Sequence, residues 1–321
     1  MNALKKGYLV ALATLISATS FAQFRLIAAE TTSGSVGGNT AQYGGVQVYD
    51  FATTGGAAAA GTGIPASALH DAIGVVVRGS DLYVSNRYGN TLGQGSIQRF
   101  GITQTGFTGG AEILTASNAN FQGFHGFNFA PDGDIWVSTV NNGSRHYTGS
   151  TDVGGSSFLP VRDAWVSPDG KRLIESQNTG LRVTNLTTNT STFFALDGNF
   201  AHQMQYQGGA LYVTTYANAG QVYKVDLNAN FEPIAKTSVA TPQQAIGLAF
   251  SPDGAEMFVS GHQSDNISRY LWNGSAWAAN GTISTGHNMG YLATVAVVPE
   301  PASLAALGLG LAAFARKRRK N

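Results

Sequence analysis

Cysteine is absent from this 321-residue chain, so it has neither a disulfide framework nor a cysteine-ligated metal or redox centre. Charged residues are scarce at 12%, and the formal net charge is only +1. This balance gives no basic surplus for binding nucleic acid and no acidic excess for a solvated tail. The interior also lacks the periodic runs of Glu, Lys, Leu and Ala that long helices need. The stability of the folded chain therefore rests on a core without covalent cross-links.

Glycine, by contrast, is plentiful at 41 residues, and runs rich in Val, Tyr and Phe alternate with turn sequences. Residues 249–260 read as a β-hairpin in which Ser251-Pro-Asp-Gly254 forms the turn. In such a turn proline pre-sets φ, aspartate caps the backbone and glycine takes the left-handed conformation. The same hairpin recurs at 129–138 and 166–176, and copies with another turn occur at 77–85 and 206–214. Five copies predict a repeat architecture.

The spacing of the hairpins predicts an all-β, six-bladed β-propeller. The first apolar residues of the second strands are separated by 53, 38, 38 and 46 residues, near the about 40–50 of a four-stranded blade. Residues 24–30 and 45–51 resemble a blade without its innermost strand, and residues 291–298 resemble the missing strand. Pairing of these N- and C-terminal strands would close the ring. Seven blades are the alternative, because the 53-residue interval contains the extra segment 101–121.

Two hairpins carry a family resemblance. Leu82-Tyr-Val-Ser-Asn86 and Leu211-Tyr-Val-Thr-Thr215 are similar to the Tyr-Val-Thr-Asn signature of one propeller superfamily. The Ser-Pro-Asp-Gly turn is shared by that group and by Tol-type and NHL-like propellers. The resemblance covers only the hairpins, so it implies the fold and selects no activity.

Both ends of the chain have the composition of targeting segments. Residues 1–22 combine a short basic start, an apolar stretch and a small-x-small site before Gln23, which is typical of a secretory signal peptide. Residues 299–321 hold Pro299-Glu300-Pro301, an apolar segment at 302–315 and a basic end at 316–320 that includes Arg316, Lys317 and Arg318. The propeller domain is expected at 23–298, between these ends.

The C-terminal segment resembles the PEP-CTERM sorting signal of Gram-negative bacteria. That resemblance implies a membrane-embedded exosortase-like enzyme as a partner, which recognises and processes the tail. It also implies an exported protein of the cell envelope or extracellular space, held in the membrane by its C-terminal segment before processing. Many relatives belong to bacteria that make extracellular polysaccharide. An ordinary C-terminal anchor without processing is the alternative.

The sequence contains none of the common catalytic motifs, and no cofactor motif is present. Polar residues near the starts of the inner strands are instead the candidate binding residues, because these strands surround the mouth of the central channel. They are His70, Asp71, His125, Arg162, Asp163, His202, Gln244 and His287. Imidazoles and carboxylates gathered there would suit a divalent cation or acid–base chemistry. The structural alternative is that they only hydrate the channel or satisfy backbone groups.

Aromatic residues beside Asn, Gly and Ser give a second indication of binding, because sugar rings stack on aromatic faces while their hydroxyls bond to amides. They are Tyr88, Tyr147, Tyr216, Trp272 and Trp277. The leading hypothesis is an exported, non-catalytic propeller that binds extracellular polysaccharide or an envelope protein. A metal-dependent hydrolase or lactonase-like enzyme with its site at the channel mouth is the alternative.

Overall fold

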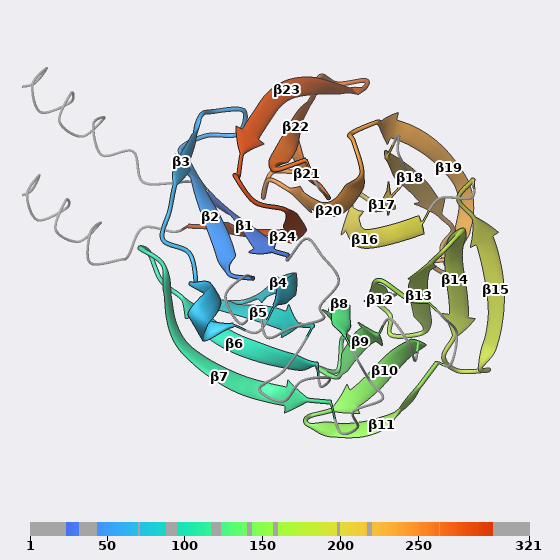
Figure 1. The fold of residues 1–321 in the computed structure, drawn as a ribbon. Helices are drawn as coiled ribbons and strands as arrows, with labels where there is room; N and C mark the ends of the chain where they lie inside the picture. The colour runs from blue at the N-terminus through green and yellow to red at the C-terminus, as the bar shows by residue number, and fades with distance from the viewer. Residues whose placement is uncertain are drawn as a thin grey trace, which may run out of the picture.

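The computed structural model describes residues 24–31, 44–69, 71–87, 95–116, 123–139, 143–156, 160–197, 200–216, 220–262 and 264–297. Over these residues the chain forms six four-stranded antiparallel sheets arranged as a ring (Figure 1). The expected six-bladed propeller is therefore confirmed, and the seven-bladed alternative is wrong. The segment that suggested an extra blade supplies the outer strand β7 (Phe107–Thr115) of the first complete blade.

Five blades each use four consecutive strands, with the first strand innermost. The innermost strands are β4 (Ala72–Arg78), β8 (Phe124–Phe129), β12 (Ala164–Val166), β16 (Phe200–Gln207) and β20 (Ala245–Phe250). The second strands are β5 (Asp81–Asn86), β9 (Ile135–Thr139), β13 (Arg172–Gln177), β17 (Ala210–Tyr216) and β21 (Glu256–Gly261). The third strands are β6 (Ser96–Ile102), β10 (Gly143–Thr148), β14 (Gly180–Asn185), β18 (Gln221–Leu227) and β22 (Asn266–Trp272). Outside them, with β7, lie β11 (Thr151–Gly155), β15 (Thr190–Ala195), β19 (Pro233–Ala240) and β23 (Trp277–Ser284).

The sixth blade joins the two ends of the described chain. Its innermost strand is β24 (Met289–Ala296), followed outward by β1 (Phe24–Glu30), β2 (Val46–Phe51) and β3 (Ala58–Ala60). β1 and β24 pair antiparallel from Phe24 opposite Ala296 to Glu30 opposite Met289. This confirms the predicted closure, which leaves neither terminal blade with an open inner edge. A short 3-10 turn, η1 (Ala66–Ala68), connects β3 to β4.

The repeated hairpin turns have the expected structural role. In the turn before β21, Asp253 Oδ1 accepts hydrogen bonds from the Ser251 hydroxyl at 2.5 Å and from the Ala255 amide at 3.1 Å. Gly254 has a φ of 70°, which is the left-handed conformation that glycine adopts without strain. Asp132 and Asp169 bond to their own turns in the same way. These aspartates are therefore caps that fix the hairpins.

The hydroxyl residue near the end of four of the five repeats joins neighbouring blades. The Ser138 hydroxyl donates to the carbonyl of Arg162 at 2.7 Å, and the Thr214 hydroxyl donates to the carbonyl of Ile246 at 2.9 Å. Ser260 reaches Gly290 at 2.6 Å, and Ser85 reaches the carbonyl of His125. Each acceptor lies on or beside the innermost strand of the next blade. The Ser or Thr at the end of these repeats thus satisfies backbone carbonyls of a neighbouring sheet, to which its own sheet is not joined by strand pairing.

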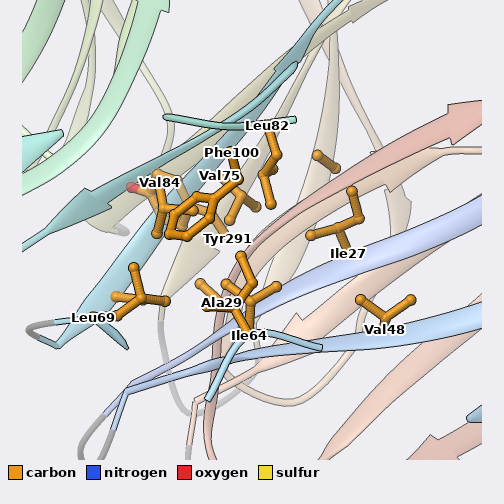
Figure 2. Close-up of a cluster of buried hydrophobic side chains, with 13 residues drawn as sticks. Ile27, Ala29, Val48, Ile64, Leu69, Val75, Leu82, Val84, Phe100 and Tyr291 are labelled. Carbon is orange, nitrogen blue, oxygen red and sulfur yellow. The ribbon is translucent and has the colours of Figure 1, made fainter. Parts of the chain in front are cut away.

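The core lies between the faces of adjacent blades. Figure 2 shows one such cluster, where Ile27, Ala29 and Val48 of the closing blade meet Val75, Leu82 and Val84 of the next blade. The ring of Tyr291, from β24, packs among these aliphatic side chains and is 2% exposed. Burial of this apolar area stabilises the contact between the first and last parts of the chain.

Candidate functional site at the mouth of the channel

Six residues occupy equivalent positions, five on the innermost strands and Asp163 directly before β12, and form a ring around the channel. In three blades the residue is glycine, at Gly74, Gly126 and Gly247. In the other three it is Asp163, Gln203 and Tyr291. The glycines make room for the larger members: a Cβ on Gly126 would lie 2.0 Å from Asp163 Oδ1 and 2.6 Å from the Tyr291 ring. The three polar side chains therefore fill the ring.

These three side chains cross the channel and bind backbone groups of other blades. Gln203 donates its amide to the carbonyl of Leu292 at 2.8 Å and accepts from the amides of Leu248 and Leu292 at 2.7 and 2.9 Å. Tyr291 donates its hydroxyl to the carbonyl of Arg162 at 2.7 Å. The three residues form a floor across the channel, which we call the channel floor.

Asp163 completes the channel floor as a buried hydrogen-bond acceptor. Its carboxylate oxygens accept from the amides of Met204 at 2.7 Å and Ala164 at 3.0 Å. Burial raises the pKa of Asp163 well above its usual value, although these two amides act in the opposite sense. This carboxylate is engaged with the backbone, so it is a structural member of the site.

Three basic side chains, His125, Arg162 and His202, lie in consecutive blades. Each of them comes one residue before the member of the six-residue ring in its own blade. In the pairing of β8 with β9 and of β16 with β17, the two histidines lie within breaks of register. A bulge of this kind re-aims the side chain that it contains. His125 is buried, whereas Arg162 and His202 are partly exposed. The structure thus brings together three of the residues predicted for the channel mouth.

Three further side chains reach the same place from the ends of second strands. Arg87, Tyr216 and His262 each lie two residues after the hydroxyl of their repeat. Tyr216 contacts His202 and His262 with ring centroids 5.9 and 5.5 Å apart. Arg87 and His262 were missed by the sequence reasoning. Their shared position, two residues after the hydroxyl residue of the repeat, is the sequence signal that would have identified them.

Burial and neighbouring basic groups lower the pKa of the three histidines of this group, which favours their neutral forms. Burial, followed by the positive charges of Arg162 and Arg87 and by His202, lowers the pKa of His125 well below its usual value. Burial, Arg162 and His262 do the same to the pKa of His202. Burial and Arg87 lower the pKa of His262. We call His125, Arg162, His202, Arg87 and His262 the basic cluster.

The remaining predicted residues contribute less to this arrangement. Asp71 lies next to the cluster, where its carboxylate is 3.4 Å from Arg87 Nε. Gln244 accepts a backbone bond from His262 at 2.9 Å through its carbonyl. His287 is exposed, and its carbonyl accepts the Thr285 hydroxyl at 2.7 Å. His70 lies outside the described residues.

A cavity lies on the other side of the channel floor. Its volume is about 310 Å³, and it is bordered by Asp163, Gln203 and Tyr291 together with later residues of the inner strands, such as Val77 and Thr294. None of the basic cluster lines it. The channel floor therefore separates the cavity from the mouth.

No group of three or more His, Asp or Glu side chains with metal-binding geometry occurs within the part of the chain that the structure describes. The aromatic residues also differ from expectation. Tyr147 is fully buried, so its interpretation as an exposed platform is wrong. Trp272 is exposed and contacts Trp277 at 5.5 Å on an outer hairpin, while Tyr88 lies outside the described residues.

The predicted signal peptide and the C-terminal tail, including Pro299, Glu300, Pro301, Arg316, Lys317 and Arg318, lie outside the described residues. A search for helices long and apolar enough to span a membrane found none among the residues that are described. Residues 297–320 match the PEP-CTERM protein-sorting motif, which confirms the resemblance of the tail. This motif implies an exported, envelope-associated protein that is processed by an exosortase.

Several solved structures resemble the chain at low sequence identity. The nidogen/laminin complex gives a TM-score of 0.61 at 12% identity, covering 86% of this chain and 100% of that one. The periplasmic gluconolactonase of Pseudomonas aeruginosa gives 0.59 at 13%, covering 86% and 99%. TolB from Acinetobacter baumannii gives 0.59 at 14%, covering 90% and 71%. A comparison with curated protein sequences found no match. These likenesses show the fold alone.

Proposed function

We propose that the protein is an exported binding protein of the envelope or extracellular matrix, sorted by its tail and binding its ligand at the channel mouth. The observation that carries this proposal is the basic cluster, which gathers side chains from different blades around a partly exposed site. Such convergence of polar groups on an otherwise apolar scaffold is typical of ligand sites. Extracellular polysaccharide or an envelope protein is the partner class proposed from the sorting motif.

The placement of the tail supports a separate sorting role. β24 closes the ring and ends at Ala296, one residue before the sorting motif begins at residue 297. Removal of residues 299–321 therefore leaves every described strand intact. We propose the same three-part organisation as the sequence predicts: a signal peptide at 1–22, the propeller at 23–298 and the tail at 299–321.

Cell fractionation tests the sorting role. Deletion of residues 299–321 should change envelope retention or release, while the thermal unfolding of the secreted domain stays unchanged. A control deletion that also removes β24 should yield aggregated protein, because it exposes the inner edge of β1. An unaltered distribution of the tail-deleted protein would refute sorting by this segment.

A glycan array tests the binding role. The full-length protein should bind glycans of extracellular polysaccharides, and His202→Gln should weaken that binding. His287→Gln is the matched control, since His287 is exposed and lies outside the basic cluster. Absence of binding to any glycan or envelope component would refute the proposal.

Lactone hydrolysis is a second candidate, favoured by the neutral imidazoles of His125 and His202. A neutral histidine at a channel mouth is suited to act as a general base on water. Turnover of gluconolactone, followed by titration of the released acid, should then be lost in His202→Gln and should be unaffected by a chelator. Equal rates with and without protein would eliminate this candidate.

A further inference from the structure

The basic cluster carries positive charge that is only partly neutralised. All Asp and Glu residues before Glu300 lie in the described parts of the chain, so their positions are known. Asp71 is the carboxylate that pairs with the cluster, at 3.4 Å from Arg87. The Asp163 carboxylate is occupied by backbone amides. Arg162 therefore contributes an unneutralised charge to the mouth.

The pKa shifts agree with this charge balance. Burial is the first cause that lowers the pKa of Arg162; Tyr291 acts in the opposite sense, and a smaller effect of the positive charge of Arg87 lowers it further. For His125 the other causes are Arg162, Arg87 and His202, and no carboxylate contributes. The field at these groups comes mainly from neighbouring basic groups, so it disfavours a metal cation and favours an anion.

Three buried polar atoms of the cluster lack a hydrogen-bond partner among the described residues: His125 Nδ1, Arg162 Nε and Arg87 Nε. His125 itself is 6% exposed. Arg87 Nε has the Asp71 carboxylate 3.4 Å away as an ion-pair partner. A buried polar group without a partner destabilises the folded state, and a ligand that supplies the partner relieves that cost. An oxyanion would give a partner to Arg162 Nε, and to His125 Nδ1 once that nitrogen carries a proton.

The wall beside these atoms suits a sugar. Tyr216 lies in ring contact with His202 and with His262 and is partly exposed. An aromatic face of this kind packs against the apolar face of a sugar ring, while a guanidinium binds a carboxylate through parallel hydrogen bonds. We propose that the channel mouth binds the carboxylate of an acidic sugar, with Arg162 as the principal anion-binding group and Tyr216 against the ring. This inference rests on the proposed binding function and names its ligand class.

Calorimetric titration of the full-length protein tests it. Glucuronate, galacturonate and gluconate are the acidic probes, an oligomer of galacturonate tests a polysaccharide source, and glucose is the neutral control. We expect the acidic sugars to bind and glucose to bind at least tenfold more weakly. Binding should tighten on acidification, because protonation of His125 and His202 adds positive charge that the anion neutralises. The charged and titratable groups that act on these histidines are Arg162 on both, Arg87 and His202 on His125, and His262 on His202.

Arg162→Gln should weaken acidic-sugar binding by about tenfold or more, the effect expected of one charge-assisted hydrogen bond. Arg99→Gln is the matched control, since Arg99 forms an exposed pair with Asp81 at 2.8 Å. If Arg162→Gln fails to fold, His202→Gln replaces it. Equal binding of glucose and glucuronate, or unchanged affinity in both cluster variants, would overturn the acidic-sugar inference but not the proposed binding of neutral glycans. If the acidic sugars do not bind while neutral glycans still bind on the array, the acidic-sugar inference is likewise wrong and the proposed binding function is retained. Absence from both assays would remove the proposed function itself.

Discussion

Replacing Gln203 with methionine tests whether the channel floor holds the propeller together. The Gln203 side chain makes three hydrogen bonds, to the amide of Leu248 in β20 and to the amide and carbonyl of Leu292 in β24. Gln203 itself is 3% exposed. Methionine has a similar length and volume but replaces none of these bonds. Three buried backbone groups on two other strands would therefore lose their partner.

The expected loss of stability follows from these three groups. Leaving one buried polar group unsatisfied costs about 1–3 kcal/mol. Gln203 borders the cavity of about 310 Å³, so water entering from that side satisfies part of the deficit. We expect the free energy of unfolding to fall by about 3–5 kcal/mol, a large share of the about 5–15 kcal/mol typical of a domain.

Urea denaturation monitored by tryptophan fluorescence and circular dichroism measures this loss. Gln207→Met is the matched control, because Gln207 lies on the same strand and borders the same cavity. Its side chain makes none of the cross-strand bonds in the described structure. If Gln203→Met loses no more than about 1 kcal/mol beyond the control, the three bonds contribute little net stability and the reasoning is wrong.

Two further predictions concern stability. Ser260→Ala should lower the free energy of unfolding by about 1–3 kcal/mol, because the Gly290 carbonyl and the Gly247 amide lose their shared partner; a change smaller than that of an exposed Ser→Ala control such as Ser275→Ala would contradict this. Acidification below about pH 6.5 should destabilise the protein through His125 and His202, since their lowered pKa values mean that the unfolded chain binds more protons. The raised pKa of Asp163 acts in the opposite direction, so the measurement compares wild type with the double variant His125→Gln/His202→Gln, whose stability should fall less with acid; parallel curves would refute the assignment.

The repeat is the part of the fold that the sequence predicts best. Each hairpin carries its own turn residues and its own alternation of apolar and polar residues, so it can be predicted without knowledge of distant contacts. The closing strand was also predictable, because an incomplete first blade requires an inner strand from elsewhere. The hydroxyl at the end of each hairpin was visible in the sequence as a small polar residue. The bond that four of these hydroxyls donate to the next blade was not visible, since that partner lies in a different sheet.

The site was predicted only in part. His125, Arg162 and His202 were placed correctly near the inner-strand starts, but whether they face one another depended on the breaks of register in β8 and β16. Local alternation says nothing about such bulges. The sequence did not indicate that Gln203 belongs to the channel floor, because nothing distinguishes it from the other glutamines of the same strand. Arg87 and His262 follow second strands, so their approach to the mouth depends on the ring geometry.

The strand that closes the ring also builds the site. Tyr291 contributes to the channel floor, and both bonds of Gln203 to Leu292 depend on β24 being in place. Three members of the basic cluster, His125, Arg162 and His202, lie one position before the ring positions of their blades. Because β24 is the last described strand and the sorting motif follows at once, the floor is complete only when the C-terminal end of the domain is in place. Ligand binding at the mouth would therefore report ring closure, and processing of the tail beyond β24 would leave it unchanged.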